Sequence, residues 1–409
     1  MRDRQLYAKI LGIEAPWEVE EVELDVGGGQ VTVRVGHHGE LWCPECGEAT
    51  PGYDTRERRW RHLDTCQYRT IIAAQVPRTR CSAHGVRQIE VPWSEPGSRF
   101  TALFEALAID LLSEMSFSGV ARLTGLSWDQ IDGIQGRAVR RGLARRELRL
   151  PRRIGVDETS FQKRHEYVTV VSSLDGDVVH VADGRGRAAL DGYYEQFDEE
   201  ELAGVDVVAM DMHAPYIAST RAYVAGAEEK IAFDKFHVAA HLGDAVDRVR
   251  RTEHRELLRW GDESLKGTRY LWLKHPDNVP EEVWRGHFRD LRESALHTAT
   301  AWSYKEWGMT LWAYRTRGWA RRGWTSWYDS AIRCGLEPVK AAARTIMDHL
   351  EGIITAIVRG VTNARAEGIN SVIQKLKYNA RGYRNRERFR NAIYFHLGGL
   401  DLYPDSIVR

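Results

Sequence analysis

Two short apolar runs in the middle of the chain each stop at an aspartate. The run Arg153–Val156 leads into Asp157, and the run Val205–Met210 leads into Asp211. Runs of this length and composition, followed by polar or turn-forming residues, predict strands. An aspartate that simply ends a strand is the commoner case. If the two strands share a sheet, however, their acids can meet at one edge and hold divalent cations through oxygen ligands.

The segment between residues 154 and 236 alternates between strand-like and helix-like patterns. We expect strands near Ile154–Asp157, Tyr167–Ser172, Val178–Ala182, Val205–Met210 and Lys230–Phe233, and helices at Arg187–Gln196 and Pro215–Val224. Three meandering strands, then helix, strand, helix and strand, is the order of a ribonuclease-H-like α/β fold. In that fold Asp157 lies on the first strand and Asp211 just after the fourth, and these two strands are neighbours. Asp234 and His237 then follow the fifth strand as candidate supporting residues, although His237 fits a helix cap or a core position better.

A third carboxylate, Glu367, lies far downstream in the stretch Val361–Asn385. Apolar residues recur here at spacings of three and four, which predicts an amphipathic helix. A basic and aromatic run follows and suggests a nucleic-acid track, with Lys375, Lys377, Arg381 and Arg384 as candidate DNA contacts. Taken alone, the stretch fits a surface helix with a solvated glutamate better. Together with the two aspartates it gives a three-acid set suited to two-metal phosphodiester chemistry.

Composition sets broad limits on the kind of protein. Lys and Arg number 58 and Asp and Glu number 58, so the net charge says nothing about partners. The sequence shows no apolar run of signal-peptide or membrane-spanning length, so we expect a soluble, intracellular protein that does not bind membranes. Five cysteines, an odd number, argue against a disulfide framework and favour a metal site or buried thiols.

Two Cys-bearing turns near the N-terminus have the spacing of a structural zinc site. The four candidate ligands are Cys43, Cys46, Cys81 and His84. Paired turns of this kind on strands hold zinc tetrahedrally, and unpaired thiols are the alternative. His62 is a weaker candidate for the fourth ligand, and Cys66 fits a small buried residue better than a ligand.

Beyond Pro92–Gly97 the pattern becomes helical and indicates a helix-turn-helix. A short helix ends at a turn, Thr124–Gly125, and Ser127 caps a second helix. A plain helical hairpin is the alternative. A strongly basic run next to the motif favours phosphate contact, and its candidate DNA contacts are Arg137, Arg140, Arg141, Arg145 and Arg146.

A tryptophan-rich helical block separates Asp211 from Glu367. Nine of the fourteen tryptophans lie between Trp260 and Trp327, and we interpret the block as an all-helical insertion in the catalytic fold. Packing between long helices is the simpler role for these rings. The alternative is that Trp319, Trp324 or Trp327 stacks on unpaired bases at a cleaved DNA end.

Over nearly its whole length the chain resembles bacterial insertion-sequence transposases of the ISL-three family. The resemblance rests on CPECG and a second Cys-bearing turn, the helix-turn-helix, IGVDETSF, VVAMDMHAPY, FDKFHV and TNARAEGINSVIQKLKYNARGYRN. The VDE, MD and C-terminal motifs are specific, whereas the zinc and helix-turn-helix parts are generic. His84 is a departure, because many relatives have Cys there.

The resemblance implies a DDE-type transposase whose acids are Asp157, Asp211 and Glu367. It would bind double-stranded DNA at the element's terminal inverted repeats, cleave the ends by two-metal hydrolysis, and join the 3′-hydroxyls to target DNA. The implied cofactors are two Mg²⁺ ions, with Mn²⁺ as a substitute, and a structural Zn²⁺. Pairing of two ends implies a homodimer or higher oligomer on DNA, and the implied location is the bacterial cytoplasm, associated with the nucleoid.

The domain arrangement that we expect has five segments. These are a zinc-binding β module (1–97), a helix-turn-helix with a basic linker (98–150), the first part of the ribonuclease-H-like domain (151–240), the helical insertion (241–358), and the second catalytic part with the Glu-bearing helix and a basic tail (359–409). Two other functions stay open: a non-catalytic DNA-binding regulator or domesticated transposase, and a ribonuclease-H-like repair nuclease. The presence of all three acids argues against the first, and the second would lack terminal-repeat specificity.

Overall fold

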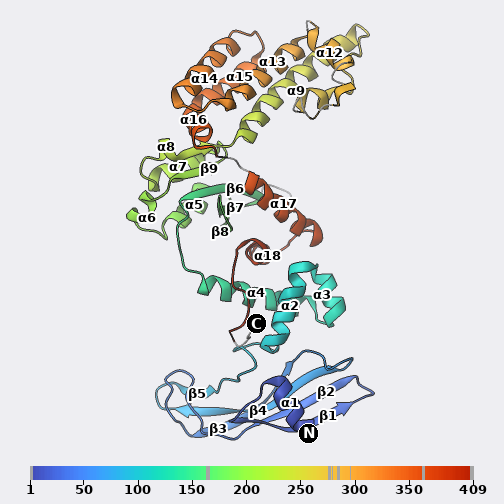
Figure 1. Ribbon diagram of the computed structural model, residues 1–409, viewed down its shortest axis with the longest axis vertical. Coiled ribbons are helices and arrows are strands. Elements are labelled where there is room, and N and C mark those ends of the chain that lie inside the picture. Colours follow the sequence, from blue (N-terminus) through green and yellow to red (C-terminus); the bar gives the residue numbers. More distant parts are fainter. Residues whose placement is uncertain are drawn as a thin grey trace. The chain divides into compact units, whose positions relative to one another are not determined.

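The computed structural model describes residues 3–162, 166–274, 278, 280–282, 286–294, 296–361 and 364–405. The side chains of residues 162, 287 and 364–367 lie outside this description. The chain divides into two compact units (Figure 1). Unit 1 comprises Met1–Glu147 and Glu387–Arg409, and unit 2 comprises Leu148–Arg386.

Unit 1 begins with a five-stranded β module. Its elements are α1 (Asp3–Leu11), β1 (Trp17–Asp25), β2 (Gln30–His37), β3 (Gly52–Arg61), β4 (Arg69–Cys81) and β5 (Gly85–Gln88). The strand order is β1-β2-β4-β3, β5 pairs with β4, and β2 and β4 run parallel. Val33, Trp60 and Ile72 are among the side chains that form its core. Cys66, which we expected to be buried, is instead exposed, with a positive φ of 53° in the short connection between β3 and β4.

The helices of unit 1 include the predicted helix-turn-helix, which is confirmed. They are α2 (Ala102–Glu114), α3 (Phe117–Thr124), α4 (Trp128–Arg145) and α18 (Arg386–Leu397). Gly125 ends α3 with a φ of 71°, a left-handed conformation that glycine adopts without strain. The side chain of Ser127 caps α4 by accepting a hydrogen bond from the backbone N–H of Gln130.

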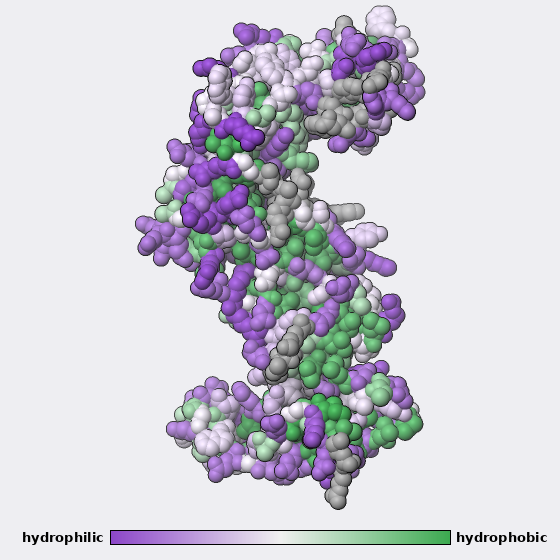
Figure 2. All heavy atoms as spheres, in the orientation of Figure 1, coloured by the Kyte–Doolittle hydropathy of each residue, from purple (hydrophilic) through white to green (hydrophobic). Residues whose placement is uncertain are grey.

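The C-terminal segment belongs to unit 1. We expected residues 359–409 to complete the catalytic domain, but the structure groups Glu387–Arg409 with the helix-turn-helix. The physical reason is apolar burial, because Phe395 and Leu402 lie in one core cluster with Ile109 and Ile131. The helices α2 and α3 also keep apolar side chains at the surface (Figure 2), among them the exposed Leu103 and Leu107 of α2.

Unit 2 contains the α/β segment that the sequence predicts. Its strands are β6 (Arg153–Gln162), β7 (Glu166–Ser173), β8 (Val178–Asp183), β9 (Val207–Met210) and β10 (Ile231–Phe233). Its first helices are α5 (Arg187–Tyr194), α6 (Glu199–Ala203), α7 (Ala214–Tyr223) and α8 (Ala227–Lys230). The strand order is β10-β9-β6-β7-β8. β7 is antiparallel to β6 and β8, whereas β6, β9 and β10 run parallel to one another.

A helical block follows β10 and leads to the helix that carries Glu367. Its helices are α9 (Lys235–Arg259), α10 (Arg269–Leu273), α12 (His287–Glu293), α13 (His297–Thr310), η2 (Leu311–Ala313), α14 (Arg317–Ala331), α15 (Glu337–Asp348), α16 (Leu350–Arg359) and α17 (Ala364–Asn379). Trp324 and Trp327 are fully buried, so the packing role is confirmed for both. Trp319 is 58% exposed, with the guanidinium of Arg322 over its ring at 4.9 Å.

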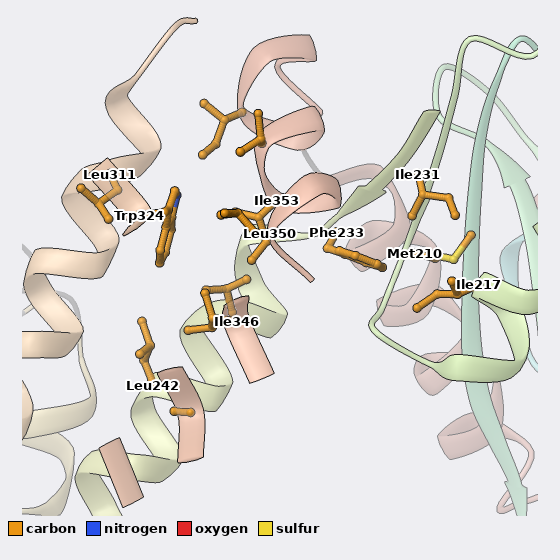
Figure 3. Close-up of a cluster of buried hydrophobic side chains, with 14 of the residues drawn as sticks. Met210, Ile217, Ile231, Phe233, Leu242, Leu311, Trp324, Ile346, Leu350 and Ile353 are labelled. Carbon is orange, nitrogen blue, oxygen red and sulfur yellow. The ribbon is translucent and has the colours of Figure 1, made fainter. Parts of the chain in front are cut away.

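The core of unit 2 runs from the sheet into the helical block. Figure 3 shows Met210 and Ile231 on one side of Phe233, with Leu350 and Ile353 on the other. All five side chains belong to one buried cluster. The sheet and the helical block therefore share a hydrophobic core. None of the helices that the structure describes is both long and apolar enough to cross a membrane.

Candidate functional site

Asp157 lies in the middle of β6, the central strand of the unit 2 sheet. Its Oδ1 accepts a hydrogen bond from the backbone N–H of Glu158 at 2.7 Å, and its Oδ2 accepts one from Nδ2 of Asn370 at 2.6 Å. Burial raises the pKa of Asp157 to about 6, and the negative charge of Asp211 acts in the same direction. Asp157 is therefore a carboxylate held in a place that disfavours its charge.

Asp211 follows β9 directly and begins the turn into α7. The parallel register pairs Gly155 with Ala209, so Asp157 and Asp211 each lie two residues beyond this pair. The carboxylate of Asp211 accepts a hydrogen bond from the backbone N–H of His213 at 3.1 Å, which fixes it at the strand end. The structure thus brings the two predicted aspartates to neighbouring positions, just beyond the last paired residues of β6 and β9.

The third predicted acid, Glu367, lies in α17. The structure describes its backbone, and its side chain falls outside the described residues. The helix itself packs against β6, the strand of Asp157. The predicted helix is therefore present beside the predicted strand, and the position of the carboxylate is left to a proposal.

Asp234 and His237 lie at the start of α9. Asp234 is buried and is the N-cap residue of this helix, and its Oδ2 has no hydrogen-bond partner among the described residues. His237 is half-buried in the first turn, and its positive charge, when present, lowers the pKa of Asp157. His237 therefore acts on Asp157, and Asp234 directly follows Phe233, which pairs with Met210 just before Asp211.

Sequence reasoning missed a row of polar contacts between α17 and β6, which we call the polar seam. Besides the bond from Asn370 to Asp157, Nε2 of Gln374 donates to Oγ1 of Thr159 at 3.2 Å. Nζ of Lys377 donates to the carbonyl oxygen of Ser160 at 2.6 Å and to its Oγ at 3.1 Å. The three α17 residues are spaced by four and three, the helical period, and that spacing is the signal in the sequence that could have shown them.

The four predicted zinc ligands converge in unit 1. One ligand atom from each of Cys43, Cys46, Cys81 and His84 lies within 4.8 Å of all the others. Sγ of Cys43 is 3.7 Å and Sγ of Cys81 is 3.5 Å from Nδ1 of His84. Backbone N–H groups of His84 and Ala83 lower the pKa of Cys81 to about 6, which favours the thiolate that binds metal. His62 lies elsewhere, buried with its Nδ1 2.9 Å from Oγ1 of Thr101.

The predicted DNA-contacting residues of α4 fall into two groups. Arg137, Arg141 and Arg145 form ion pairs within unit 1: Arg137 with Glu105, Arg141 with Glu95 and Glu105, and Arg145 with Asp401 and Asp405. Arg140 is exposed, and the guanidinium of Arg146 lies over the ring of Tyr394 at 5.8 Å. Three of the five predicted arginines therefore pair with carboxylates of the protein itself.

The predicted contacts near the C-terminal end of α17 also differ among themselves. Lys375, Arg381 and Arg384 are exposed. Lys377 is half-buried in the polar seam, and burial lowers the pKa of its ammonium group. Three of these four cations are therefore open to a ligand in unit 2.

Family models match three successive parts of the chain. A model described as a transposase, of the DDE type in family ISL3, matches residues 154–393. A model for the helix-turn-helix domain of transposase family ISL3 matches residues 89–139. A model for the zinc-finger of the transposases of IS204, IS1001, IS1096 and IS1165 matches residues 40–84.

Two relatives that match nearly the whole chain are also insertion-sequence transposases. The chain is 28% identical over 404 residues to the transposase for insertion sequence element IS1001 of Bordetella parapertussis, which covers 95% of this chain and 97% of that protein. It is also 28% identical over 436 residues to the transposase for insertion sequence element IS1557 of Mycobacterium tuberculosis, covering 94% and 93%. Each alignment covers more than nine-tenths of this chain.

Proposed function

The chain belongs to the ISL3 family of transposases, named ISL-three above, and we propose that Asp157, Asp211 and Glu367 are the three acids of its DDE site. The family match and the relatives make it a DNA-binding DDE transposase. The observation that carries the residue assignment is the register of β6 and β9, which sets the two aspartates side by side. The packing of α17 against β6 supports Glu367 as the third acid.

The catalytic domain has a ribonuclease-H-like fold in this proposal. The support is the strand order, with three antiparallel strands followed by two parallel ones that add on the other side of β6. In this arrangement the parallel register of β6 and β9 brings Asp157 and Asp211 to neighbouring positions. The helical block from α9 to α16 is then an insertion between the second and the third acid.

The donor set fits divalent magnesium. Carboxylate oxygens are the ligands that Mg²⁺ prefers, and Mn²⁺ takes the same donors. Burial raises the pKa of Asp157, and a bound cation would offset this penalty on its charged form. When bound, such ions lower the pKa of an attacking water and stabilise the leaving oxygen.

The reaction is hydrolysis followed by strand transfer. Water attacks the phosphate at the element's end, a P–O bond to the water oxygen forms, and the P–O3′ bond breaks to release a 3′-hydroxyl. That hydroxyl then attacks a target phosphodiester, whose own O3′ leaves with the proton. The protein holds Asp157 and Asp211 in fixed positions. A hydrogen bond from Asn370 holds Asp157, and one from the backbone N–H of His213 holds Asp211.

Other parts of the chain bind and organise the DNA. We propose that the Cys43, Cys46, Cys81 and His84 cluster holds a structural zinc, and that this module and the helix-turn-helix recognise the terminal inverted repeats. The exposed cations that we propose for phosphate contact are Arg140, Lys375, Arg381 and Arg384. Pairing of the two ends requires at least a homodimer, and the proposed setting is nucleoid DNA in the bacterial cytoplasm.

Cleavage of oligonucleotides that carry the element's ends tests this proposal. The wild type, Asp157→Asn, Asp211→Asn and Glu367→Gln are compared for end binding without divalent metal, and for nicking and strand joining with Mg²⁺ or Mn²⁺. We expect equal binding and at least a 10³-fold loss of cleavage in each variant, because each loses a charged metal ligand. A wild type that binds ends but never cuts them would favour the non-catalytic regulator. Cutting without preference for the terminal repeats would favour the repair nuclease.

A further inference from the structure

The polar seam sets the register of α17 on β6. Asn370, Gln374 and Lys377 occupy positions i, i+4 and i+7 of the helix, and their acceptors are on Asp157, Thr159 and Ser160 of the strand. A helix held at three successive turns cannot slide along or rotate about its axis without breaking these bonds. Glu367 is three residues before Asn370, so the same bonds fix the backbone to which the proposed third acid is attached.

Asn370 differs from the other two members of the polar seam, because its acceptor is one of the proposed catalytic acids. The bond from its Nδ2 to Oδ2 of Asp157 is 2.6 Å long. The other oxygen of Asp157 accepts from the backbone of Glu158. These two donors hold the carboxylate in a single orientation. Without them, rotation about the side-chain torsions of Asp157 would give other orientations.

We propose that Asn370 is a positioning residue of the DDE site, which holds the Asp157 carboxylate in its metal-binding orientation and ties that carboxylate to the helix of Glu367. The inference rests on the proposed function, since it takes Asp157 as a metal ligand. Asn370 acts through Asp157 and takes no part in bond making.

A second feature of Asn370 supports this role. Its Oδ1 is buried and has no hydrogen-bond partner among the described residues. A buried acceptor without a partner is costly, and a water in the site would satisfy it. Rotating the amide to exchange its two ends would instead turn Oδ1 toward the carboxylate, which is repulsive.

The test measures metal binding directly, with Mn²⁺ alone as the probe. The full-length wild type, Asn370→Ala, Gln374→Ala and Asp157→Asn are titrated with Mn²⁺ without DNA, and free Mn²⁺ is followed by electron paramagnetic resonance. Gln374→Ala is the matched control, because it removes an amide from the same helix whose acceptor is the Thr159 hydroxyl. Thermal unfolding checks that each variant folds, and Asn370→Leu, close in shape to Asn, replaces the Ala variant if that one does not.

We expect Asn370→Ala to raise the Mn²⁺ dissociation constant about tenfold, as for the loss of one hydrogen bond to a charged group. Gln374→Ala should raise it clearly less than Asn370→Ala does, because the Asp157 carboxylate keeps both of its hydrogen-bond donors. The Mn²⁺ concentration for half-maximal cleavage should rise in parallel for Asn370→Ala, and excess Mn²⁺ should restore most of the rate. A general folding defect would not respond to metal in this way.

Two results overturn the proposal in distinguishable ways. If Asp157→Asn abolishes Mn²⁺ binding while Asn370→Ala binds as tightly as Gln374→Ala, the acids form the metal site and only the positioning role is wrong. If Asp157→Asn keeps the wild-type affinity, Asp157 is not a metal ligand, and both the proposed function and this inference fail.

Discussion

Gly352 of α16 lies directly against the ring of Phe233 at the end of β10. A Cβ atom at Gly352 would come within 2.4 Å of Cδ2 and Cε2 of Phe233, a distance that real contacts do not allow. The ring also meets the imidazole of His349 edge to face, with centroids 5.2 Å apart. Glycine at this position therefore lets the helical block approach the unit 2 sheet closely enough to share one core.

Gly352→Ala should destabilise unit 2 although alanine is the better helix former. We expect a loss of about 1–3 kcal/mol from overpacking against Phe233, which exceeds the gain in helix propensity of up to ~1 kcal/mol. Thermal unfolding checks the prediction. Gly192→Ala in α5 is the matched control, because nothing lies within 4 Å of its Cβ and it should be neutral or slightly stabilising. Equal effects of both substitutions would contradict the close approach.

Cys46→Ser should remove zinc from the protein. Elemental analysis of the wild type should give about one zinc per chain, and the variant should give much less, because three ligands do not close a structural tetrahedral site. Its unfolding temperature and its binding to terminal repeats should fall together. His84→Cys should retain zinc, since both residue types are zinc ligands, and Cys66→Ser should change nothing, because Cys66 is exposed outside the cluster. Full zinc content in Cys46→Ser would disprove the site.

Acid should destabilise unit 1 through His62. Burial, with the charge of Arg61 as the second cause, lowers the pKa of His62 to about 4, against 6.5 for the unfolded chain. Below pH 6.5 the unfolded state therefore takes up a proton that the native state refuses until about pH 4. The free energy of unfolding should fall by about 3 kcal/mol across this window.

Urea unfolding between pH 4.5 and pH 7 measures the effect of His62. His62→Gln should have a shallower pH dependence than the wild type over this range, because the titrating group is gone. Protonation of the zinc ligands affects both proteins alike and cancels in the comparison. Parallel curves for the two proteins would show that His62 does not carry this dependence.

Arg140 and Arg141 are adjacent in α4 and should behave oppositely. Arg141 pairs with Glu95 and with Glu105, which is only 1% exposed, so Arg141→Ala should destabilise the protein by about 3–5 kcal/mol. Arg140→Ala should leave stability within about 0.5 kcal/mol, because Arg140 is exposed. If Arg140 contacts a phosphate, Arg140→Ala should reduce the slope of log affinity for the DNA ends against log salt concentration by about one. Thermal unfolding measures the effect on stability, and binding at several salt concentrations measures the effect on phosphate contact. A clearly destabilised Arg140→Ala would show that Arg140 has a structural role instead.

Local patterns in the sequence predicted much of the fold. The strand that carries Asp157, the strand that ends before Asp211, the helix of Glu367 and the turn at Gly125 all depend on residues within a few positions of one another. The spacing of Cys43 with Cys46 and of Cys81 with His84 is equally local. Short-range periodicity and turn chemistry decide such features, and they are visible in one sequence.

Burial and pairing were predicted less well, because they depend on which distant segments meet. Cys66 was expected inside and is exposed. The arginines of α4 all suggested phosphate contact, yet Arg141 and Arg145 find carboxylates that the sequence does not place beside them, Arg145 with Asp401 and Asp405 of the C-terminal segment. The sequence does not show whether an arginine or lysine binds a DNA phosphate or a carboxylate of the protein itself.

The sequence by itself determined the strands, the helices, the zinc-ligand spacing and the identity of the candidate acids, because each follows from neighbours along the chain. Only the tertiary structure decided that the C-terminal segment packs with the helix-turn-helix and that Asn370 holds Asp157 across 213 positions of sequence. The physical reason is that hydrogen bonds, ion pairs and apolar burial act over a few ångströms in space. Helical spacing shows which residues share a face, and only the folded chain shows what that face meets.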